Sequence, residues 1–395
     1  MKKKIVIIGG GTAGITTAAM LKNKSLNFEI SIIDPSEDHY YQPLWTLVGG
    51  GIFNKEKSMK KMKDVIPSGT TWIQDSVKTF DPESNSVYLN EQTDPITYDY
   101  LIICPGIQID WDKVEGLREA MGKNGVCSNY DYNYVDYTWK FIQKTKSGNA
   151  LFTYPNTPIK CGGAPQKIMY LAEEFFRKVN QRNNINVEFV TAGERVFGVQ
   201  KYREALERII KDREINTSFN LNLTKVDGQN NIAFFTNVKT GEIVEKEYNL
   251  LHAVPPMSAP DFIKESPISD NAGWVDVDKF TLQHNKYKNI FSLGDASSLP
   301  TSKTGAAIRK EAPVLVNNLV LFDQGKELIH KYNGYTSCPL VTGYSKVIMA
   351  EFDYDGNPLE SFPFDQSKES YSMFLAKKYG IPFMYWNAML NGYTG

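Results

Sequence analysis

The fold of this chain is decided by the stretch IVIIGGGTAG at residues 5–14. Its first four residues are apolar and mostly β-branched, which predicts a buried parallel strand. Gly9, Gly11 and Gly14 then form a G-x-G-x-x-G pattern that leads directly into a helical segment at residues 15–21. A second strand is expected over residues 28–33 and ends at Asp34. A strand, a glycine turn, a helix and a second strand together predict a βαβ unit.

The glycine pattern predicts a dinucleotide site, because each position has its own physical reason. Gly9 permits the tight turn, Gly11 lets the backbone approach a pyrophosphate, and Gly14 lets the helix pack closely on the strand. The free N–H groups of the helix N-terminus stabilise phosphate charge. Asp34, twenty residues after Gly14, is placed to accept hydrogen bonds from a ribose. A glycine turn without a ligand is the alternative, and the complete βαβ context argues against it.

Two later segments favour FAD over NAD as the dinucleotide. The stretch LIICPG at residues 101–106 resembles the strand and turn that rejoin the nucleotide domain in flavoproteins with two dinucleotide sites. The stretch IFSLGDA at residues 290–296 resembles their second FAD motif, in which a strand-end Asp binds the ribityl chain. The residues expected to bind the cofactor are Gly9, Gly11, Thr12, Ala13, Gly14, Asp34, Gln42, Val77, Cys104, Pro105, Gly106, Gly294, Asp295, Lys303 and Gly305.

The middle of the chain predicts a second Rossmann-like domain that lacks a glycine fingerprint. A strand is expected over residues 150–154, a helix over residues 166–180, and further strands over residues 187–190 and 250–254. Between the first strand and the helix stands PNTPIKCGGAP, which places Cys161 where a phosphate-binding turn is expected. NAD(P)H is therefore disfavoured as the electron donor.

We predict an α/β fold with two Rossmann-like dinucleotide-binding-type domains and a C-terminal membrane-interface region. The length of 395 residues suits two to three domains. Residues 1–149 are assigned to the first part of the FAD-binding domain, and residues 150–285 to the second domain, which carries Cys161. Residues 286–330 are expected to return to the FAD-binding domain. The C-terminal region, residues 331–395, carries Cys338.

Composition and charge exclude several classes of protein. The chain has 44 basic and 45 acidic residues, so its net charge of −1 provides no electrostatic footprint for nucleic acid. No run of eighteen apolar residues occurs, so no spanning helix is expected. Four cysteines in so long a chain exclude a disulfide-stapled secreted scaffold. The apolar run near the N-terminus is too short for a secretory leader, so a cytoplasmic location is expected.

Cys161 and Cys338 are the candidate catalytic residues. Cys161 precedes a predicted helix N-terminus, and Lys160 and Lys167 add positive charge nearby. Both effects lower a thiol pKa and raise its thiolate fraction. Cys338 lies in TSCPLV at residues 336–341, which is expected to be a loop. No C-x-x-C motif and no histidine cluster occurs, so a metal site is not expected.

The other cysteines and the histidines carry weaker signals. Cys104 ends an apolar strand and is expected to be a buried filler. Cys127 has three open interpretations: a third redox participant, a covalent flavin attachment, or a filler. The four histidines stand in no motif and receive no role: His39, His252, His284 and His330.

The cysteine segments resemble those of the sulfide:quinone oxidoreductases, relatives of the flavoprotein disulfide reductases. NTPIKCGGAPQKIMYL at residues 156–171 resembles the first redox-cysteine region of the branch that includes the mitochondrial enzymes. TSCPLV at residues 336–341 resembles the second, and PTSKTGAA at residues 300–307 is also similar to that branch. The resemblance runs through nearly the whole chain, and its cysteine motifs are more specific than the glycine fingerprint.

The resemblance implies an FAD enzyme that oxidises sulfide and reduces a membrane quinone. Cys161 and Cys338 would form a disulfide or polysulfide bridge beside the flavin, and hydrosulfide would attack it to leave a persulfide and a thiolate. Electrons would pass through FAD to the quinone, and the sulfane sulfur would leave to sulfite, a thiol or further sulfide. Lys303 and Gly305 are expected near the flavin pyrimidine edge, with a solvated surface lysine as the alternative.

The C-terminal tail is the candidate membrane contact. Residues 373–390 combine aromatic, Met and Leu side chains with Lys377 and Lys378, which is typical of a segment lying in the membrane interface. A buried cap or a subunit contact is the alternative. We therefore expect peripheral association with the inner face of the cell membrane, and a homo-oligomer stays open. Four aromatic residues are candidates for a quinone pocket or for ordinary packing: Phe352, Tyr354, Phe362 and Phe364.

Three other functions compete with sulfide oxidation by a quinone. The missing second glycine fingerprint argues against a quinone-linked NADH dehydrogenase. The absent export signal and the matched cysteine segments argue against a sulfide dehydrogenase flavoprotein that passes electrons to a cytochrome. A flavin-binding sensor or scaffold without enzymatic activity leaves the two cysteine motifs unexplained.

Overall fold

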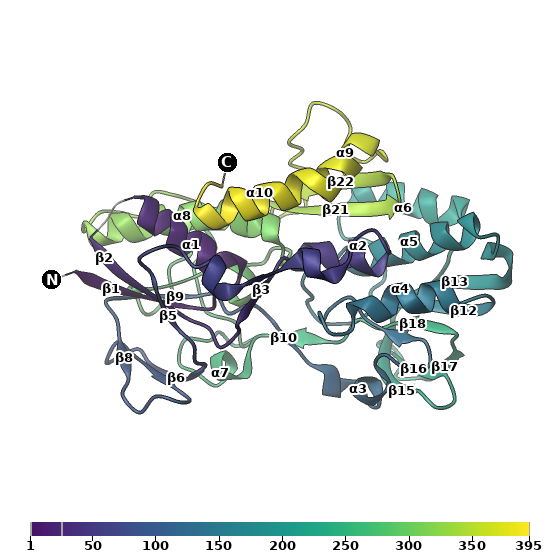
Figure 1. The fold of residues 1–395 in the computed structure, drawn as a ribbon, viewed down its shortest axis with the longest axis horizontal. Helices are drawn as coiled ribbons and strands as arrows, with labels where there is room; N and C mark the ends of the chain where they lie inside the picture. The colour runs from purple at the N-terminus through teal and green to yellow at the C-terminus, as the bar shows by residue number, and fades with distance from the viewer. Residues whose placement is uncertain (1, 25–26, 395) are drawn as a thin grey trace.

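A five-stranded parallel sheet lies in the half of the molecule that contains the N-terminus (Figure 1). The computed structural model describes residues 2–24 and 27–394. The strands are ordered β20-β9-β1-β2-β5, and every neighbouring pair is parallel. Their bounds are β1 (Lys3–Ile8), β2 (Phe28–Ile33), β5 (Thr71–Ile73), β9 (Tyr100–Ile103) and β20 (Ile290–Ser292). The return of β20 to this sheet supports the proposed assignment of residues 286–330 to the first domain.

The apolar run that opens the chain is buried on both faces of this sheet. Ile5 and Ile7 have no exposed surface, and Val6 and Ile8 on the opposite face are 2% exposed. A parallel strand is buried in this way because connecting helices cover the sheet. The helix that follows β1, α1 (Thr12–Asn23), packs against α8 (Gly305–Asp323), which follows β20 (Figure 1).

A second parallel sheet forms the other half of the molecule. Its strands are ordered β11-β18-β12-β13-β14, and every pair is parallel. Their bounds are β11 (Val126–Cys127), β12 (Gly148–Tyr154), β13 (Ile185–Thr191), β14 (Asn216–Ser218) and β18 (Leu250–His252). The associated helices are α4 (Val135–Lys144), α5 (Ala164–Lys178) and α6 (Gln200–Asp212). The prediction of an α/β fold with two Rossmann-like parts is therefore confirmed.

Smaller antiparallel elements complete the two halves. Two three-stranded sheets contain β6 (Val77–Asp81), β7 (Ser86–Leu89), β8 (Ile96–Thr97), β15 (Leu221–Asp227), β16 (Ile232–Asn237) and β17 (Ile243–Glu247). Three strand pairs contain β3 (Asp38–Tyr40), β4 (Met59–Lys61), β10 (Gln108–Ile109), β19 (Met257–Ser258), β21 (Thr336–Gly343) and β22 (Lys346–Phe352). The short helices are α2 (Trp45–Gly49), α3 (Leu117–Ala120), α7 (Asp261–Lys264), α9 (Tyr371–Leu375) and α10 (Ile381–Asn387).

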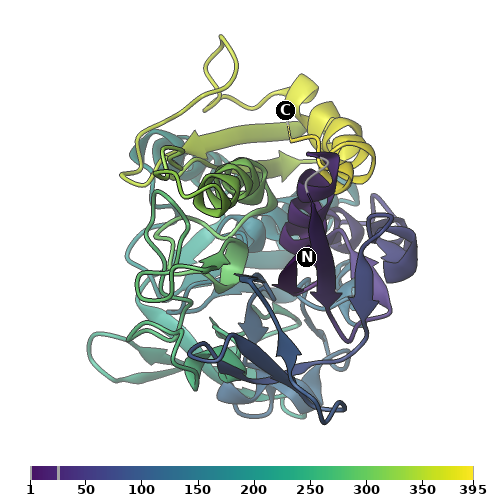
Figure 2. The ribbon, with the colours of Figure 1, turned by 90° about the vertical axis from the view of Figure 1, so that its left-hand side faces the viewer.

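The C-terminal region runs along one edge of the molecule and contacts both halves. Strand β21 packs against α5 of the second half, and the turn Met389–Asn391 packs against α1 of the first. Helices α9 and α10 lie along the top edge in both views (Figures 1 and 2). A π-helical turn, Ala376–Gly380, joins them, and Pro382 stands in the first turn of α10, where proline is tolerated.

An inner strand of the first sheet, β9, offers a test of this core. Ile102 in β9 is fully buried between β1 and β20, so Ile102→Ala should lower the free energy of unfolding by about 2–5 kcal/mol. Urea unfolding followed by circular dichroism measures this change. Ile243→Ala is the control, because Ile243 in β17 is 64% exposed and its truncation should cost within about 0.5 kcal/mol. Equal losses in the two variants would contradict the described packing.

Candidate active site

The sulfur atoms of Cys161 and Cys338 lie 3.7 Å apart, although 177 residues separate them in the chain. Cys161 lies in the turn between β12 and α5, and Cys338 lies in β21, which packs against α5. The expectation that Cys338 stands in a loop was wrong: it pairs across from Ala350 in β22 and is 2% exposed. A disulfide bond between these atoms requires only a small further approach, since its S–S length is about 2 Å.

The backbone around Cys161 allows this approach. Cys161 has a φ of +56°, a left-handed conformation that costs a non-glycine residue about 1–3 kcal/mol. Its N–H donates to the Lys303 carbonyl at 2.8 Å, which ties the turn to the segment after β20. A Cβ atom at Gly163 would lie 2.5 Å from the Cys338 sulfur, so only glycine leaves room for the second sulfur there.

The electrostatics of the pair distinguish the two sulfurs. The Cys338 thiol donates a hydrogen bond to the Cys161 sulfur, and the Lys167 Nζ lies 3.1 Å from the same sulfur. Both contacts hold the pKa of the Cys161 thiol well below its usual value, although burial opposes them. The same contact raises the pKa of Cys338 well above its usual value, because Cys338 keeps the proton. Cys161 is therefore the thiolate of the reduced pair.

Lys377 is a site residue that the sequence did not identify. It was expected among the interfacial lysines of the tail, yet it is 3% exposed and its Nζ donates to the Pro43 carbonyl at 3.0 Å. Burial, together with the nearby charge of Lys167, lowers the pKa of Lys377 to about 7. Its own charge helps to lower the pKa of Cys161. No local pattern separates it from Lys378, which is only half-buried.

The glycine turn after β1 has the geometry that a dinucleotide requires. Gly9 has a φ of +101°, and a Cβ there would lie 2.5 Å from the Cys104 carbonyl oxygen. A Cβ at Gly14 would collide with the Gly9 carbonyl oxygen. Gly11 stands at the N-terminus of α1 and, as a glycine, offers no side chain to cap its N–H groups. These N–H groups are therefore available to a phosphate.

Open space lies beyond the carboxyl ends of the same sheet. A Cβ built at Gly11, Gly106 or Gly305 would meet no atom of the described residues within 4 Å. These glycines follow β1, β9 and β20, which are adjacent strands. Ligands of such sheets bind at this edge. The residues present therefore fit a dinucleotide that lies across it.

Asp34 already has partners in the protein. Its Oδ2 accepts from the Gly10 N–H at 2.6 Å and its Oδ1 from the Ser36 N–H at 2.8 Å. Burial raises the pKa of Asp34, and these two backbone donors oppose the rise. Asp34 therefore holds the glycine turn, and any ribose contact uses its remaining lone pairs.

The second predicted cofactor motif forms a buried charged cluster. Lys303 donates to the Asp295 carbonyl at 2.6 Å, and its Nζ lies 3.9 Å from the centre of the Trp274 ring, so it is not a solvated surface lysine. Glu311, which no motif marks, accepts from the Gly294 N–H at 2.8 Å. Burial raises the pKa of Glu311 to about 7.

The other cysteines and the remaining predicted cofactor residues differ in their burial and position. Gln42 is exposed, at the start of the short 3₁₀ turn Gln42–Leu44, whereas Val77 is buried in β6. Cys104 is buried with its thiol 3.9 Å from the Gly9 carbonyl oxygen. Cys127 is fully buried in β11, and burial raises its pKa to about 12, which favours a packing role. Ala13 lies in the first turn of α1, Pro105 follows β9, and Gly294 follows β20 with a φ of +72°.

His39 connects the glycine turn to the C-terminal helix. Its Nδ1 donates to the Gly10 carbonyl at 2.9 Å, and its Nε2 accepts from the Tyr385 hydroxyl at 2.6 Å. Tyr385 in turn lies 2.9 Å from the Thr12 hydroxyl. Burial lowers the pKa of His39 to about 4, so the ring is neutral at physiological pH. No sequence motif predicted a role for His39, because its contacts join segments that are far apart in the chain.

A cavity of about 700 Å³ opens beside the cysteine turn. Among its lining residues are Tyr154, Gly162, Arg203 and Phe352. Tyr354 also lines it. Phe362 and Phe364 are instead exposed on the loop between β22 and α9, with their rings stacked 5.4 Å apart. The four aromatic candidates for a quinone pocket are therefore not brought together.

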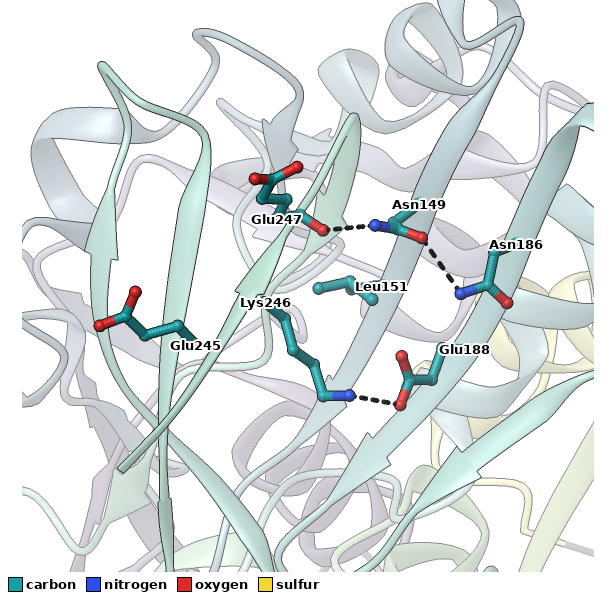
Figure 3. A pocket seen from close by; sticks show the side chains of 7 residues that line it. All are labelled: Asn149, Leu151, Asn186, Glu188, Glu245, Lys246 and Glu247. Carbon is teal, nitrogen blue, oxygen red and sulfur yellow. Dashed lines mark hydrogen bonds and ion pairs between the residues drawn. The ribbon is translucent and has the colours of Figure 1, made fainter. Parts of the chain in front are cut away.

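A second cavity, of about 360 Å³, lies on the second sheet and contains no predicted site residue (Figure 3). Its polar groups contact one another: Lys246 pairs with Glu188 at 2.9 Å, and the Asn186 amide donates to Asn149 at 3.1 Å. Within residues 2–24 and 27–394, no group of three or more His, Cys, Asp or Glu side chains is arranged to hold a metal ion.

Comparison with known proteins gives concordant matches. Residues 3–140 match the pyridine nucleotide-disulphide oxidoreductase family. The mitochondrial sulfide:quinone oxidoreductase of Mus musculus is 49% identical over 393 residues, which cover 99% of this chain and 87% of that protein. Its counterpart in Dictyostelium discoideum is 51% identical over 392 residues, or 98% and 86% of the two chains. The crystal structure of the Aquifex aeolicus sulfide:quinone oxidoreductase superposes with a TM-score of 0.84 at 20% identity, covering 99% and 92% of the chains, and shows the shared fold.

Removal of the Lys167 charge should make Cys161 less acidic. Lys167→Met keeps the length of the side chain but removes the ammonium, so the pKa of the Cys161 thiol should rise by about 1–3 units. Only the thiolate reacts with iodoacetamide, so the fall in alkylation rate on acidification should begin at a higher pH in the variant. Peptide mass spectrometry of the reduced protein measures the rate at Cys161. Lys140→Met, which changes an exposed lysine on α4, is the control. An unchanged profile in Lys167→Met would exclude this charge effect.

Proposed function

The chain belongs to the sulfide:quinone oxidoreductase family, and we propose that it oxidises sulfide at the Cys161–Cys338 pair with a quinone as electron acceptor. The observation that carries the proposal is the 3.7 Å separation of the two sulfurs next to the Lys167 ammonium. Burial of two thiols with a cation costs free energy of folding, which is offset when one thiol is a thiolate that pairs with the cation and takes part in redox chemistry. The activity is that of an oxidoreductase.

FAD is the proposed cofactor. Gly9, Gly11 and Gly14 with the N-terminus of α1 would hold its pyrophosphate, and Asp34 its ribose. Asp295 would face the ribityl chain. Bound FAD would supply two-electron transfer between the cysteine sulfurs and the quinone.

The N-terminus of α8 would support the other end of this cofactor. Gly305 begins α8, and Thr304 caps it by accepting from the Ala307 N–H at 3.1 Å. Lys303 holds a positive charge beside this terminus. A helix N-terminus and a cation favour negative charge on a ligand, so these groups suit the pyrimidine edge of an isoalloxazine ring.

The cysteine pair performs the sulfur chemistry from its disulfide state. Hydrosulfide attacks the Cys338 sulfur, a new S–S bond forms there, and the Cys161–Cys338 bond breaks to leave a thiolate on Cys161. The persulfide is assigned to Cys338 because Cys161 has the lower pKa and is the better leaving group. Lys167 stabilises the leaving thiolate through its contact at 3.1 Å.

The sulfane sulfur then leaves to a small nucleophile, and the pair is oxidised again. A nucleophile takes the outer sulfur from Cys338, which leaves two cysteine thiolates. The return of these thiolates to the disulfide releases the electron pair that the quinone finally accepts. Sulfite, a low-molecular-weight thiol or further sulfide has the required nucleophilic sulfur.

The 700 Å³ cavity is the proposed route for this nucleophile. It reaches Gly162, which follows Cys161 directly, and Arg195 and Arg203 place positive charge on its wall. Asp353 and Asp355 also line it, so the cavity has both signs of charge. Anionic acceptors would be drawn toward the arginine side.

A quinone-linked NADH dehydrogenase is less well supported. The turn between β12 and α5 holds Cys161 and Gly163 against β21 instead of cradling a phosphate. No feature of the described residues favours electron transfer to a cytochrome partner. Sulfide remains the donor that explains the sulfur pair.

The outer surface of the C-terminal region is the proposed membrane contact. Four large apolar side chains are exposed between residues 371 and 383: Tyr371, Leu375, Tyr379 and Phe383. Phe383 is the most exposed of them, at 70%. Among the described helices, none combines the length and apolar character needed to cross a bilayer. We infer peripheral attachment through this edge (Figure 2), at the inner face of the cell membrane, where a quinone is within reach.

Reaction with sulfide tests the proposed activity directly. Under anaerobic conditions, sulfide should bleach the flavin absorbance, NADH should not, and a soluble quinone should restore it. Cys161→Ser and Cys338→Ser should each slow the bleaching at least about a thousandfold, because a hydroxyl cannot form the disulfide. Cys127→Ala, which changes a cysteine inside the second sheet, is the control. Undiminished sulfide turnover in both serine variants would refute the assignment of the pair.

Vesicle binding tests the membrane contact. Phe383→Asp should weaken co-sedimentation with lipid vesicles by about tenfold, because it removes the burial of a large apolar side chain in the interface. Val238→Asp is the matched control, since Val238 is 44% exposed on the turn after β16, away from the C-terminal edge (Figure 1). Turnover with a soluble quinone should stay unchanged in both variants. Equal binding of Phe383→Asp and the unmodified protein would rule out this surface.

A further inference from the structure

The C-terminal region packs on α1, the helix whose N-terminus is the proposed phosphate site (Figure 1). Tyr385 of α10 and Thr12, the first residue of α1, have their hydroxyl oxygens 2.9 Å apart. At the other end of α1, the Asn23 amide donates to the Asn391 carbonyl at 2.7 Å. The C-terminal region therefore contacts α1 at both of its ends.

The hydrogen bonds that join Tyr385 to the glycine turn have a defined direction. The Gly10 carbonyl can only accept, so the His39 Nδ1, 2.9 Å away, carries a proton. Burial lowers the pKa of His39 and keeps its ring neutral, so the Nε2 accepts from the Tyr385 hydroxyl at 2.6 Å. Tyr385 has then used its only proton and accepts from Thr12. The Thr12 hydroxyl proton is thus directed at Tyr385 and not at a ligand.

His39 also determines the direction of the Gly11 N–H. The Gly10 carbonyl and the Gly11 N–H belong to one planar trans peptide, so they point in opposite directions. Hydrogen bonds hold Gly10 on both sides, because its N–H donates to the Asp34 Oδ2 at 2.6 Å and its carbonyl accepts from His39. The Gly11 N–H is therefore turned away from His39. Gly11 borders open space, since a Cβ there would meet no atom of the described residues within 4 Å.

We propose that Tyr385 and His39 are positioning residues of the dinucleotide site, which fix the Gly10–Gly11 peptide so that its N–H faces a cofactor phosphate. The inference rests on the proposed FAD cofactor. A carbonyl oxygen turned toward a phosphate repels it, whereas the opposite orientation of the same peptide offers a donor. The phosphate is then held by backbone N–H groups of the turn, without the Thr12 hydroxyl. Both residues act through the turn and not on the phosphate itself.

The packing of Tyr385 is separable from its hydrogen bonds. The side chain is 3% exposed, and the centre of its ring lies 4.3 Å from that of the Tyr41 ring. Phenylalanine keeps this packing and removes only the hydroxyl. The His39 Nε2 then loses its donor, and the Thr12 hydroxyl loses its acceptor.

The experiment measures how fast FAD leaves the flavin-loaded full chain, from the rise in flavin fluorescence on dilution. Tyr385→Phe should release FAD about tenfold faster, which is the effect of one or two lost neutral hydrogen bonds. Tyr202→Phe is the matched control, because Tyr202 in α6 is also buried and its hydroxyl also makes two hydrogen bonds. It donates to the Glu351 carbonyl at 3.1 Å and accepts from the Glu351 N–H at 3.2 Å. This control should release FAD at the unmodified rate.

Two variants of His39 test its contact with Gly10. His39→Leu removes the donor to the Gly10 carbonyl and should release FAD at least about tenfold faster. His39→Asn keeps an amide N–H near the position of Nδ1, so it should restore most of the retention that His39→Leu loses. Packing alone would favour leucine over asparagine at this buried position.

A third comparison separates cofactor affinity from chemistry and from stability. Tyr385→Phe and Tyr202→Phe each lose buried hydrogen bonds, so both should lower the urea unfolding midpoint. At saturating FAD, the rate of bleaching by sulfide per bound flavin should stay within about twofold in Tyr385→Phe, because the change acts on the phosphate end of the cofactor.

Three results would overturn the inference. One is an unchanged rate of FAD release in Tyr385→Phe. Another is equally fast release in Tyr202→Phe, which would indicate a general loss of stability. The third is release from His39→Asn that is as fast as from His39→Leu.

The same measurements distinguish this inference from the proposed function. If the flavin-loaded protein fails to react with sulfide, the proposed function falls, whereas the release rates still decide the role of Tyr385. If the unmodified chain retains no FAD, the proposed cofactor falls and this inference falls with it.

Discussion

The approach of strand β21 to the N-terminus of α5 is the contact on which the rest of this site depends. It brings the sulfurs of Cys161 and Cys338 to 3.7 Å, and Gly163 permits it because a Cβ there would lie 2.5 Å from the second sulfur. The left-handed backbone at Cys161 and its hydrogen bond to the Lys303 carbonyl hold the first sulfur in place. The same contact thus joins the cysteine turn to the segment that follows the second cofactor motif.

Buried cations give this contact its chemical character. Lys167 and Lys377 are each 3% exposed, and water screens neither of them. In such surroundings an ammonium interacts strongly with a thiolate, so the pair has one acidic and one basic thiol. The desolvation cost of the lysines is offset when Cys161 is ionised. In the proposed mechanism, this division of roles makes Cys161 the leaving group and Cys338 the carrier of the transferred sulfur.

The C-terminal region has two different faces. Its inner face supplies Lys377 to the sulfur site and Tyr385 to the His39 and Thr12 side chains at the glycine turn. Its outer face carries exposed aromatic residues that suit a membrane interface. One short segment therefore connects the dinucleotide turn, the cysteine pair and the proposed lipid surface. The alternative of a buried cap describes the inner face, whereas the interfacial role of the outer face stays a prediction.

The sequence was sufficient to predict the elements and motifs that depend only on neighbouring residues. The apolar run at residues 5–8, the glycine pattern and the strand-end Asp295 predicted the parallel sheets, because burial period and turn geometry are properties of neighbouring residues. Only the tertiary structure placed Cys338 in a strand, buried Lys377 and joined His39 to Tyr385. These features depend on contacts between residues far apart in the chain, and a pattern of neighbours contains no information about them. The residue types therefore predicted the proposed chemistry of the sulfur pair, whereas packing between distant segments determines the pKa values of its two thiols.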